Sequence, residues 1–213
     1  MKTKFLIALA TLFLATACSA QTTKKESNMK DKKVLVVFFS HAGENYSVGN
    51  IKVGNTKIVA DYICGQTGAD QFEIVTHKYD GMAYKPLCDL AQDEQVKDER
   101  PAFEGKIVAA DGKTVAAAPS QADFDKYDVV FIGGPVWWGT YPQVIFTFFD
   151  TYNLNGKTLI PFTTHEGSGL GSCVGDVKKN YPHAEVKQGF SIYGHEVRSG
   201  KAKVEKWLNA IGF

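Results

Sequence analysis

The sequence lacks an excess of charge of either sign. Its 213 residues carry 24 Lys and Arg against 23 Asp and Glu, which gives a formal net charge of +1. A nucleic-acid-binding domain usually shows a basic stripe and a clear positive balance. We therefore expect no nucleic-acid partner, and no strong electrostatic steering of a charged ligand.

Cysteine is also scarce, with four in the chain. Cys64, Cys88 and Cys173 follow Cys18 at intervals that do not match the spacing of metal ligands, so the sequence indicates no metal site. If Cys18 is set apart, an odd number remains and at least one thiol stays free. An oxidising compartment would permit a disulfide among the three, whereas buried unpaired cysteines are the simpler expectation.

No hydrophobic run is long enough to span a bilayer. The longest apolar stretch, residues 5–14, follows two lysines and precedes small residues at 15–17, which is the pattern of a signal peptide. We predict that residues 1–17 are removed and that the protein is exported. Their removal takes away two lysines and changes the net charge from +1 to −1.

The residue after this leader is Cys18, and the surrounding sequence resembles the lipobox of bacterial lipoproteins. That resemblance implies lipidation of Cys18 and a membrane-anchored lipoprotein; a plain secreted or periplasmic protein is the alternative. Residues 18–32 are mostly polar and predict a solvated tether. By its length, 33–213 is a single domain.

Apolar runs and amphipathic segments alternate through 33–213. The run at 34–39 is apolar on both faces, which is typical of a central strand covered on both sides. Further strands are predicted at 72–76, 128–133, 158–164 and 185–189, and helices at 56–64, 85–97, 142–152, 172–180 and 200–211. Asp111 and Gly112 between short apolar runs predict an inserted β-hairpin near 107–115. The pattern predicts an α/β fold with a doubly wound, five-stranded parallel sheet.

The loops after the first, third and fourth strands have unusual compositions. In an open parallel sheet these loops meet at the carboxyl edge, where ligands bind. The first loop, residues 40–57, is rich in hydroxyls, amides and glycines and leads into a helix, so its backbone amides can cradle a phosphate. An ordinary turn with Asn55 or Thr56 as N-cap is an equally good interpretation.

Three motifs together resemble the flavodoxin-like proteins, in particular a bacterial branch with a paired Trp-Trp-Gly. They are Gly-Asn-Thr at 54–56, Gly-Pro-Val-Trp-Trp-Gly-Thr-Tyr-Pro at 134–142 and Thr-His-Glu-Gly-Ser-Gly at 164–169. The resemblance covers 33–213. It implies that FMN binds non-covalently and that the strand order is 2-1-3-4-5, the order known for flavodoxin.

The resemblance also implies which residues bind FMN. The phosphate is expected at the first loop, one of the two tryptophans is expected to stack on the flavin, and the Gly139 peptide is expected to rotate so that its carbonyl accepts a hydrogen bond from the reduced ring. Residues 42–53, an insertion in the first loop, are expected to form a flap. The expected cofactor-binding residues are Ser40, His41, Asn55, Thr56, Pro135, Val136, Trp137, Trp138, Gly139, Thr164, His165, Gly167, Ser168 and Gly169.

Three functions are compatible with these features. The first is an exported electron-transfer flavoprotein that exchanges electrons with a redox partner protein or a membrane electron-transfer chain. The second is an FMN-dependent oxidoreductase of quinones or nitroaromatics, and the third is a non-redox surface lipoprotein that binds another phosphate ester. Export favours the first, because NAD(P)H is a cytoplasmic donor. The near-neutral charge favours the second, because dedicated flavodoxins resemble one another in being strongly acidic.

Overall fold

The structure, a computed structural model, describes residues 29–213. The predicted signal peptide, the predicted lipidation site Cys18 and residues 19–28 of the tether lie outside this range. The last part of the tether is not solvated as expected: Met29–Asp31 form a 3-10 turn, η1, and Met29 packs against the hydrophobic core. Within 29–213, no helix is long and apolar enough to cross a membrane.

Strands and helices alternate along the chain, as predicted. The strands are β1 (Val34–Phe39), β2 (Gly43–Asn45), β3 (Gly49–Ile51), β4 (Asp70–Ile74), β5 (Ile107–Val108), β6 (Thr114–Ala116), β7 (Val129–Pro135), β8 (Thr158–His165), β9 (Glu185–Val186) and β10 (Phe190–Tyr193). The helices are α1 (Asn55–Thr67), α2 (Tyr84–Lys97), α3 (Gln121–Phe124), α4 (Gln143–Thr151), α5 (Cys173–Asn180), η2 (Gly194–Ser199, a 3-10 helix) and α6 (Lys201–Ala210).

The main sheet runs in the order β10-β8-β7-β1-β4-β5-β6. The strands β4, β1, β7, β8 and β10 are parallel, and counted along the chain they lie in the order 2-1-3-4-5. The predicted hairpin is confirmed as β5 and β6; β5 joins the edge of the sheet antiparallel to β4, and β6 pairs with β5. The predicted last strand is divided into β9 and β10, both parallel to β8, so the five predicted strands become six, and the hairpin brings the described sheet to eight.

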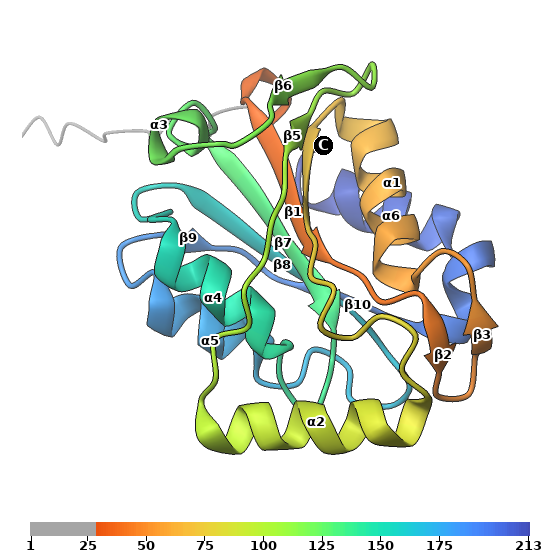
Figure 1. The fold of residues 1–213 in the computed structure, drawn as a ribbon. Helices are drawn as coiled ribbons and strands as arrows, with labels where there is room; N and C mark the ends of the chain where they lie inside the picture. Colours follow the sequence, from red (N-terminus) through yellow and green to blue (C-terminus); the bar gives the residue numbers. More distant parts are fainter. Residues whose placement is uncertain (1–28) are drawn as a thin grey trace, which may run out of the picture.

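Helices cover both faces of the sheet (Figure 1). All six residues of β1 are buried, and they alternate between the two cores. Leu35, Val37 and Phe39 pack in the core beneath α4 and α5. Val34, Val36 and Phe38 pack in the core beneath α1 and α6. A strand covered on both faces needs apolar residues at every position, which explains the uninterrupted run in the sequence.

Helix α1 is longer than predicted. It continues through Gly65 and ends at Gly68, which adopts a left-handed φ of 68°. A glycine inside a helix costs only about 1 kcal/mol relative to alanine, and packing of Val59, Ala60 and Ile63 against the sheet offsets that cost.

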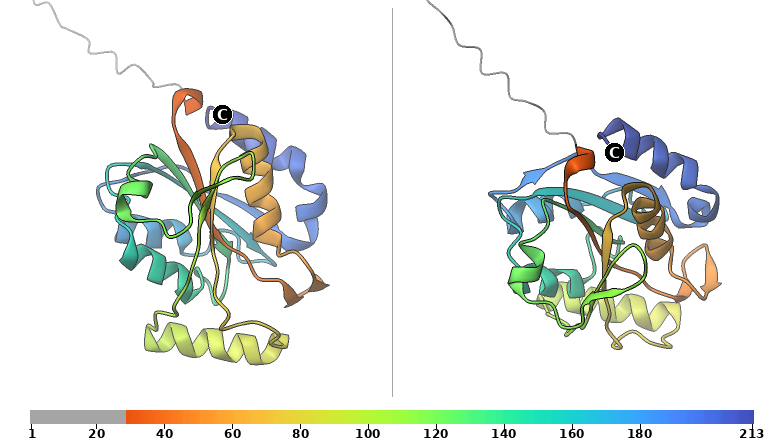
Figure 2. Two further views of the ribbon diagram at one scale, coloured as in Figure 1. Left: turned by 45° about the horizontal axis from the view of Figure 1, so that its top comes forward. Right: turned by 90° about the horizontal axis from the view of Figure 1, so that it is seen from above.

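Helix α2 crosses the carboxyl ends of the strands instead of lying along the sheet (Figures 1 and 2). A buried carboxylate holds it there. Glu94 on α2 is 1% exposed, accepts a hydrogen bond from the Tyr79 hydroxyl at 2.7 Å, and lies 2.7 Å from the Lys78 ammonium. Both partners belong to the loop between β4 and α2. This placement makes α2 a wall of the space at the carboxyl edge.

Candidate functional site

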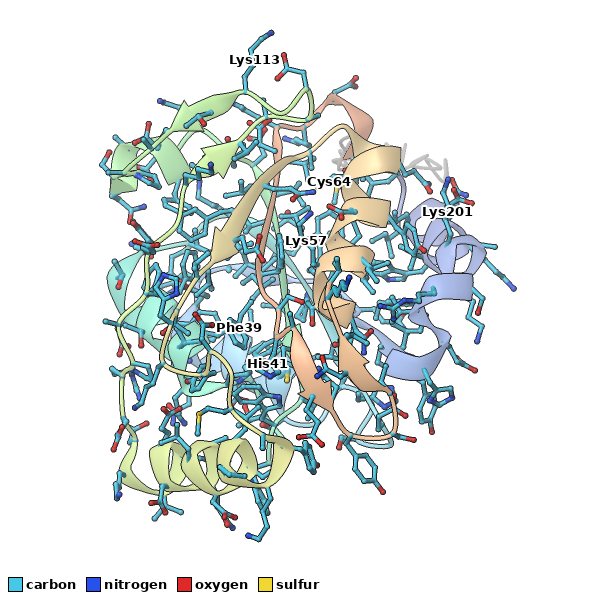
Figure 3. The ribbon with its side chains drawn as sticks, turned by 45° about the vertical axis from the view of Figure 1, so that its right-hand side comes forward. Phe39, His41, Lys57, Cys64, Lys113 and Lys201 are labelled. Atoms are coloured by element: carbon cyan, nitrogen blue, oxygen red, sulfur yellow. The ribbon has the colours of Figure 1, made fainter. Side chains whose placement is uncertain are left out.

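The loops at the carboxyl edge enclose a cleft of about 310 Å³. Figure 3 shows His41 at the end of β1 that faces α2. Of the expected residues, ten line the cleft: His41, Asn55, Thr56, Pro135, Val136, Trp137, Trp138, Thr164, His165 and Ser168. The other four, Ser40, Gly139, Gly167 and Gly169, are not among the lining residues.

The amino end of α1 forms one wall. Its N-cap is Gly54, not Asn55 or Thr56, and no side chain caps it as a conventional N-cap would. A Cβ at Gly54 would lie 2.2 Å from Ser40 Oγ and 2.6 Å from the His41 carbonyl, so only glycine fits. Ser40 Oγ accepts the Lys57 N–H at 3.0 Å, while the N–H groups of Asn55 and Thr56 have no partner within 29–213. Two unpaired amides at a helix amino terminus favour an anion.

Two of the motifs meet directly. The hydroxyl oxygens of Thr56 and Thr164 lie 2.8 Å apart, although 108 residues separate them in the chain. Thr56 is 1% exposed and Thr164 4% exposed. This hydrogen bond joins the start of α1 to the end of β8, so the two motifs form one continuous wall.

His41 lines the cleft and has a ring nitrogen without a partner. Its Nε2 is buried and forms no hydrogen bond with the described residues. Burial lowers the pKa of His41, and the distant charge of Asp80 opposes this shift only partly, so the ring is neutral at pH 7.

The two adjacent tryptophans have different environments. The Trp137 ring packs edge-on against Phe39, Tyr79 and His41, at centroid distances of 5.7, 5.2 and 5.8 Å. Trp138 has a φ of 49° and is 50% exposed, and its Nε1 donates to the Cys88 carbonyl of α2 at 2.9 Å. Trp137 therefore anchors the loop, and Trp138 presents the open ring.

Two hydrogen bonds oppose the expected rotation of the Gly139 peptide. The Gly139 carbonyl accepts the Ser172 N–H at 2.8 Å, and the Thr140 N–H of the same peptide donates to the Trp137 carbonyl at 3.1 Å. Rotation would break both hydrogen bonds, at a cost of about 0.5–1.5 kcal/mol each. Gly139 faces α5 rather than the cleft.

The end of β8 and the loop after it continue the wall that starts at α1. The Gly167 N–H donates to His165 Nδ1 at 2.9 Å, so Nδ1 is the acceptor and the neutral ring carries its proton on Nε2. Burial lowers the pKa of His165, while Glu166 acts in the opposite direction. Gly169 does not line the cleft, and its carbonyl accepts a hydrogen bond from the Thr163 hydroxyl at 2.8 Å.

Ten lining residues were not among the fourteen expected cofactor-binding residues, although one of them, Glu166, lies within the third motif. They belong to the hairpin β2–β3, to one face of α2 and to the segments around Glu166 and Gly194. They are Glu44, Asn45, Tyr46, Val48, Tyr84, Leu87, Cys88, Ala91, Glu166 and Gly194. The hairpin forms from the predicted flap, and it touches α2 through Glu44, which accepts the Tyr84 N–H at 2.7 Å, and through Tyr46, whose ring stacks on Tyr84 at 5.8 Å.

Comparison with known proteins gives the family. A family model described as flavodoxin matches residues 33–211. The chain belongs to the flavodoxin family. The match spans every strand of the main sheet and all three motif-bearing loops, so the resemblance that the motifs carry is confirmed at the level of the family.

Solved structures show the same flavodoxin-like α/β fold. A candidate flavoprotein from Bacteroides eggerthii is 26% identical, with a TM-score of 0.60 over 85% of this chain and 99% of that one. One from Bacteroides uniformis is 24% identical, with a TM-score of 0.62 over 84% and 98%. A flavoprotein from Lactobacillus acidophilus, solved in complex with FMN, is 20% identical, with a TM-score of 0.55 over 83% and 98%. No protein with a curated description matches the chain.

Proposed function

We propose that this flavodoxin-family protein binds FMN non-covalently in the cleft and acts in electron transfer. The observation that carries the proposal is the shared cleft: unpaired amides at the start of α1 and the open ring of Trp138 line the same space of about 310 Å³. That volume lies within the usual range for cofactor sites. The FMN complex of the Lactobacillus acidophilus flavoprotein, which shares the fold, supports the choice of cofactor.

The residues fit each part of FMN. The amides of Asn55 and Thr56 would hold the phosphate, with the positive end of α1 behind them. Trp138 would pack against one face of the flavin ring, because it is the tryptophan without aromatic neighbours of its own. Thr164, His165 and Ser168 would border the ring from the loop after β8.

When bound, FMN supplies one- and two-electron redox chemistry, and the chain holds and shields it. Trp137 and Val136 keep the loop after β7 in place, and the α2 face formed by Leu87, Cys88 and Ala91 limits access of water to the ring. Holding and shielding FMN requires no acid–base catalysis by a side chain, and for this reason electron transfer is the function we favour.

An FMN-dependent oxidoreductase of quinones or nitroaromatics is the second candidate, and one observation favours it. Tyr46 and Tyr84 form a stacked pair in the lining of the cleft, and Tyr46 is 61% exposed. A flat exposed ring beside a flavin is a surface on which a planar acceptor can pack. Rapid oxidation of NADPH that depends on a quinone or nitroaromatic acceptor would support this candidate over electron transfer.

Export and lipid anchoring at Cys18 belong to the same proposal. The fold shows where such an anchor would join the domain. Met29–Asp31 lie at the amino end of β1, near the carboxyl terminus and at the opposite edge from α2 and the cleft (Figure 2). If residues 18–28 tether the domain to a membrane, the point of attachment lies at the edge opposite the cleft, which leaves the cleft open to a redox partner protein or to a membrane electron-transfer chain.

The absorption spectrum of the purified full-length protein tests the proposal. We expect the visible absorption of an oxidised flavin, either as purified or after incubation with FMN and removal of the excess. A protein that stays colourless after this treatment would overturn the proposed function.

A further inference from the structure

Arg198 is an exposed cation that none of the three motifs includes and that reaches the cleft only through its contact with Asn55. It belongs to η2, which follows β10, the last strand of the sheet. Its Nη1 donates to Asn55 Oδ1 at 3.3 Å, across 143 residues of sequence. Within 29–213, Arg198 forms no ion pair with a carboxylate, so its charge is not neutralised there.

The contact with Arg198 fixes the orientation of the Asn55 amide. A guanidinium has only donors, so the oxygen of the amide must face Arg198 and the NH2 group must point the other way. Asn55 is 7% exposed and lines the cleft, and its Nδ2 has no hydrogen-bond partner among residues 29–213. Arg198 thereby turns an unpaired donor of a largely buried residue toward the cleft.

Gly194 leaves room for that donor. A Cβ at Gly194 would lie 2.5 Å from Asn55 Nδ2 and 2.8 Å from Glu166 Oε1. Glu166 is the carboxylate nearest to this point, and it already has partners: Oε1 accepts the His195 N–H at 2.9 Å, and Oε2 lies 2.7 Å from His195 Nδ1. The donors at the start of α1 therefore remain available for an anion.

We infer that Arg198 is a positioning residue that makes the cleft selective for a phosphorylated flavin. It does so by holding the Asn55 NH2 group toward the phosphate and by adding an unneutralised positive charge behind it. Charge-assisted hydrogen bonds and aligned donors act on the phosphate dianion and not on the uncharged ribityl chain of riboflavin. The inference rests on the proposed function and deepens it, because it states which flavin the site selects and why.

Titration of the full-length protein with FMN and with riboflavin, followed by quenching of flavin fluorescence, tests the inference. Arg198→Gln is expected to weaken FMN binding about tenfold, as one charge-assisted contact would, and to leave riboflavin binding within about twofold. Arg198→Lys, which keeps the charge and a donor, should restore part of the FMN affinity. Lys201→Gln, at an exposed lysine three residues away, is the matched control and should change neither affinity.

A second variant reports on the amide alone. Asn55→Asp keeps an oxygen toward Arg198 and replaces the NH2 group by a carboxylate oxygen. We expect it to weaken FMN binding more than Arg198→Gln does, again with little effect on riboflavin.

The outcomes are distinct. Equal weakening of both flavins by Arg198→Gln would mean a general structural role and would overturn the inference, as would an unchanged FMN affinity. If the wild-type protein binds neither flavin, the proposed function fails as well. If the wild type binds FMN but does not prefer it to riboflavin, only the inference fails.

Discussion

Thr56 and Thr164 share a hydrogen bond of 2.8 Å between their hydroxyl oxygens, and both side chains line the cleft. Thr56 lies in the first turn of α1 and Thr164 near the end of β8, and β1 and β8 lie on either side of β7 in the sheet. The contact joins two of the motifs at the carboxyl edge of the sheet, where the proposed phosphate-binding and ring-binding parts of the flavin site would share a wall.

Replacement of Trp138 tests the assignment of the open ring. Trp138→Ala should weaken FMN binding at least about tenfold, because an aromatic pair contributes roughly 0.5–1.5 kcal/mol beyond the area that it buries. Trp138→Phe keeps a flat ring and should retain most of the affinity. Val96→Ala, at a 79% exposed position on α2, is the control and should bind FMN like the wild type. Fluorescence titration measures all three, and equal affinities for Trp138→Ala and the wild type would refute the stacking assignment.

The buried carboxylate of α2 should matter for stability. Glu94→Ala leaves the buried Tyr79 hydroxyl without its partner and the Lys78 ammonium with only the exposed Glu99, which should lower the free energy of unfolding by about 1–3 kcal/mol. Glu99→Ala removes an exposed partner of the same lysine, 3.0 Å from Nζ, and should cost less than about 1 kcal/mol. Urea denaturation compares the two. A larger loss for Glu99→Ala would contradict the role given to Glu94.

Burial of His41 predicts a dependence of stability on pH. Because burial lowers the pKa of His41 in the folded protein, the unfolded chain binds a proton more readily, and stability falls as the pH drops through the unfolded value of about 6.5. His41→Gln should therefore lose less free energy of unfolding between pH 7 and pH 5 than the wild type. Urea denaturation at both pH values is the measurement. An equal loss in both proteins would show that His41 does not contribute.

The contact between the hairpin and α2 should slow the release of FMN. Glu44→Ala removes the carboxylate that accepts the first N–H of α2, an interaction comparable to a helix cap of about 1 kcal/mol, so FMN should dissociate several-fold faster. Asp89→Ala, which removes only an exposed ion pair with Lys85 on the same helix, is the control. Stopped-flow displacement of bound FMN gives both rates. Identical rates for the two variants would argue against the hairpin as a cover.

Much of the fold and part of the site could be predicted from the sequence. The apolar run of β1 and the Asp111-Gly112 turn each carry a local signal that determines an element. Thr56, Trp138 and Thr164 could be found because each lies in a short motif directly after a strand, and parallel strands bring such loops to one edge.

The remaining site residues could not be found in this way. Leu87 and Ala91 are four residues apart and indicate a buried helix face, but nothing in α2 shows that this face covers the end of the sheet rather than one of its sides. Gly194 and Arg198 reach the site only because η2 turns back after β10 toward the start of α1. Such placements depend on contacts between distant segments, which local patterns do not encode.

A crystal structure of the protein with FMN tests the central claim most directly. The account predicts phosphate oxygens within hydrogen-bond distance of the Asn55 and Thr56 amides, and the flavin ring against Trp138 beside His165. A flavin bound elsewhere, or a phosphate remote from the amino end of α1, would contradict it.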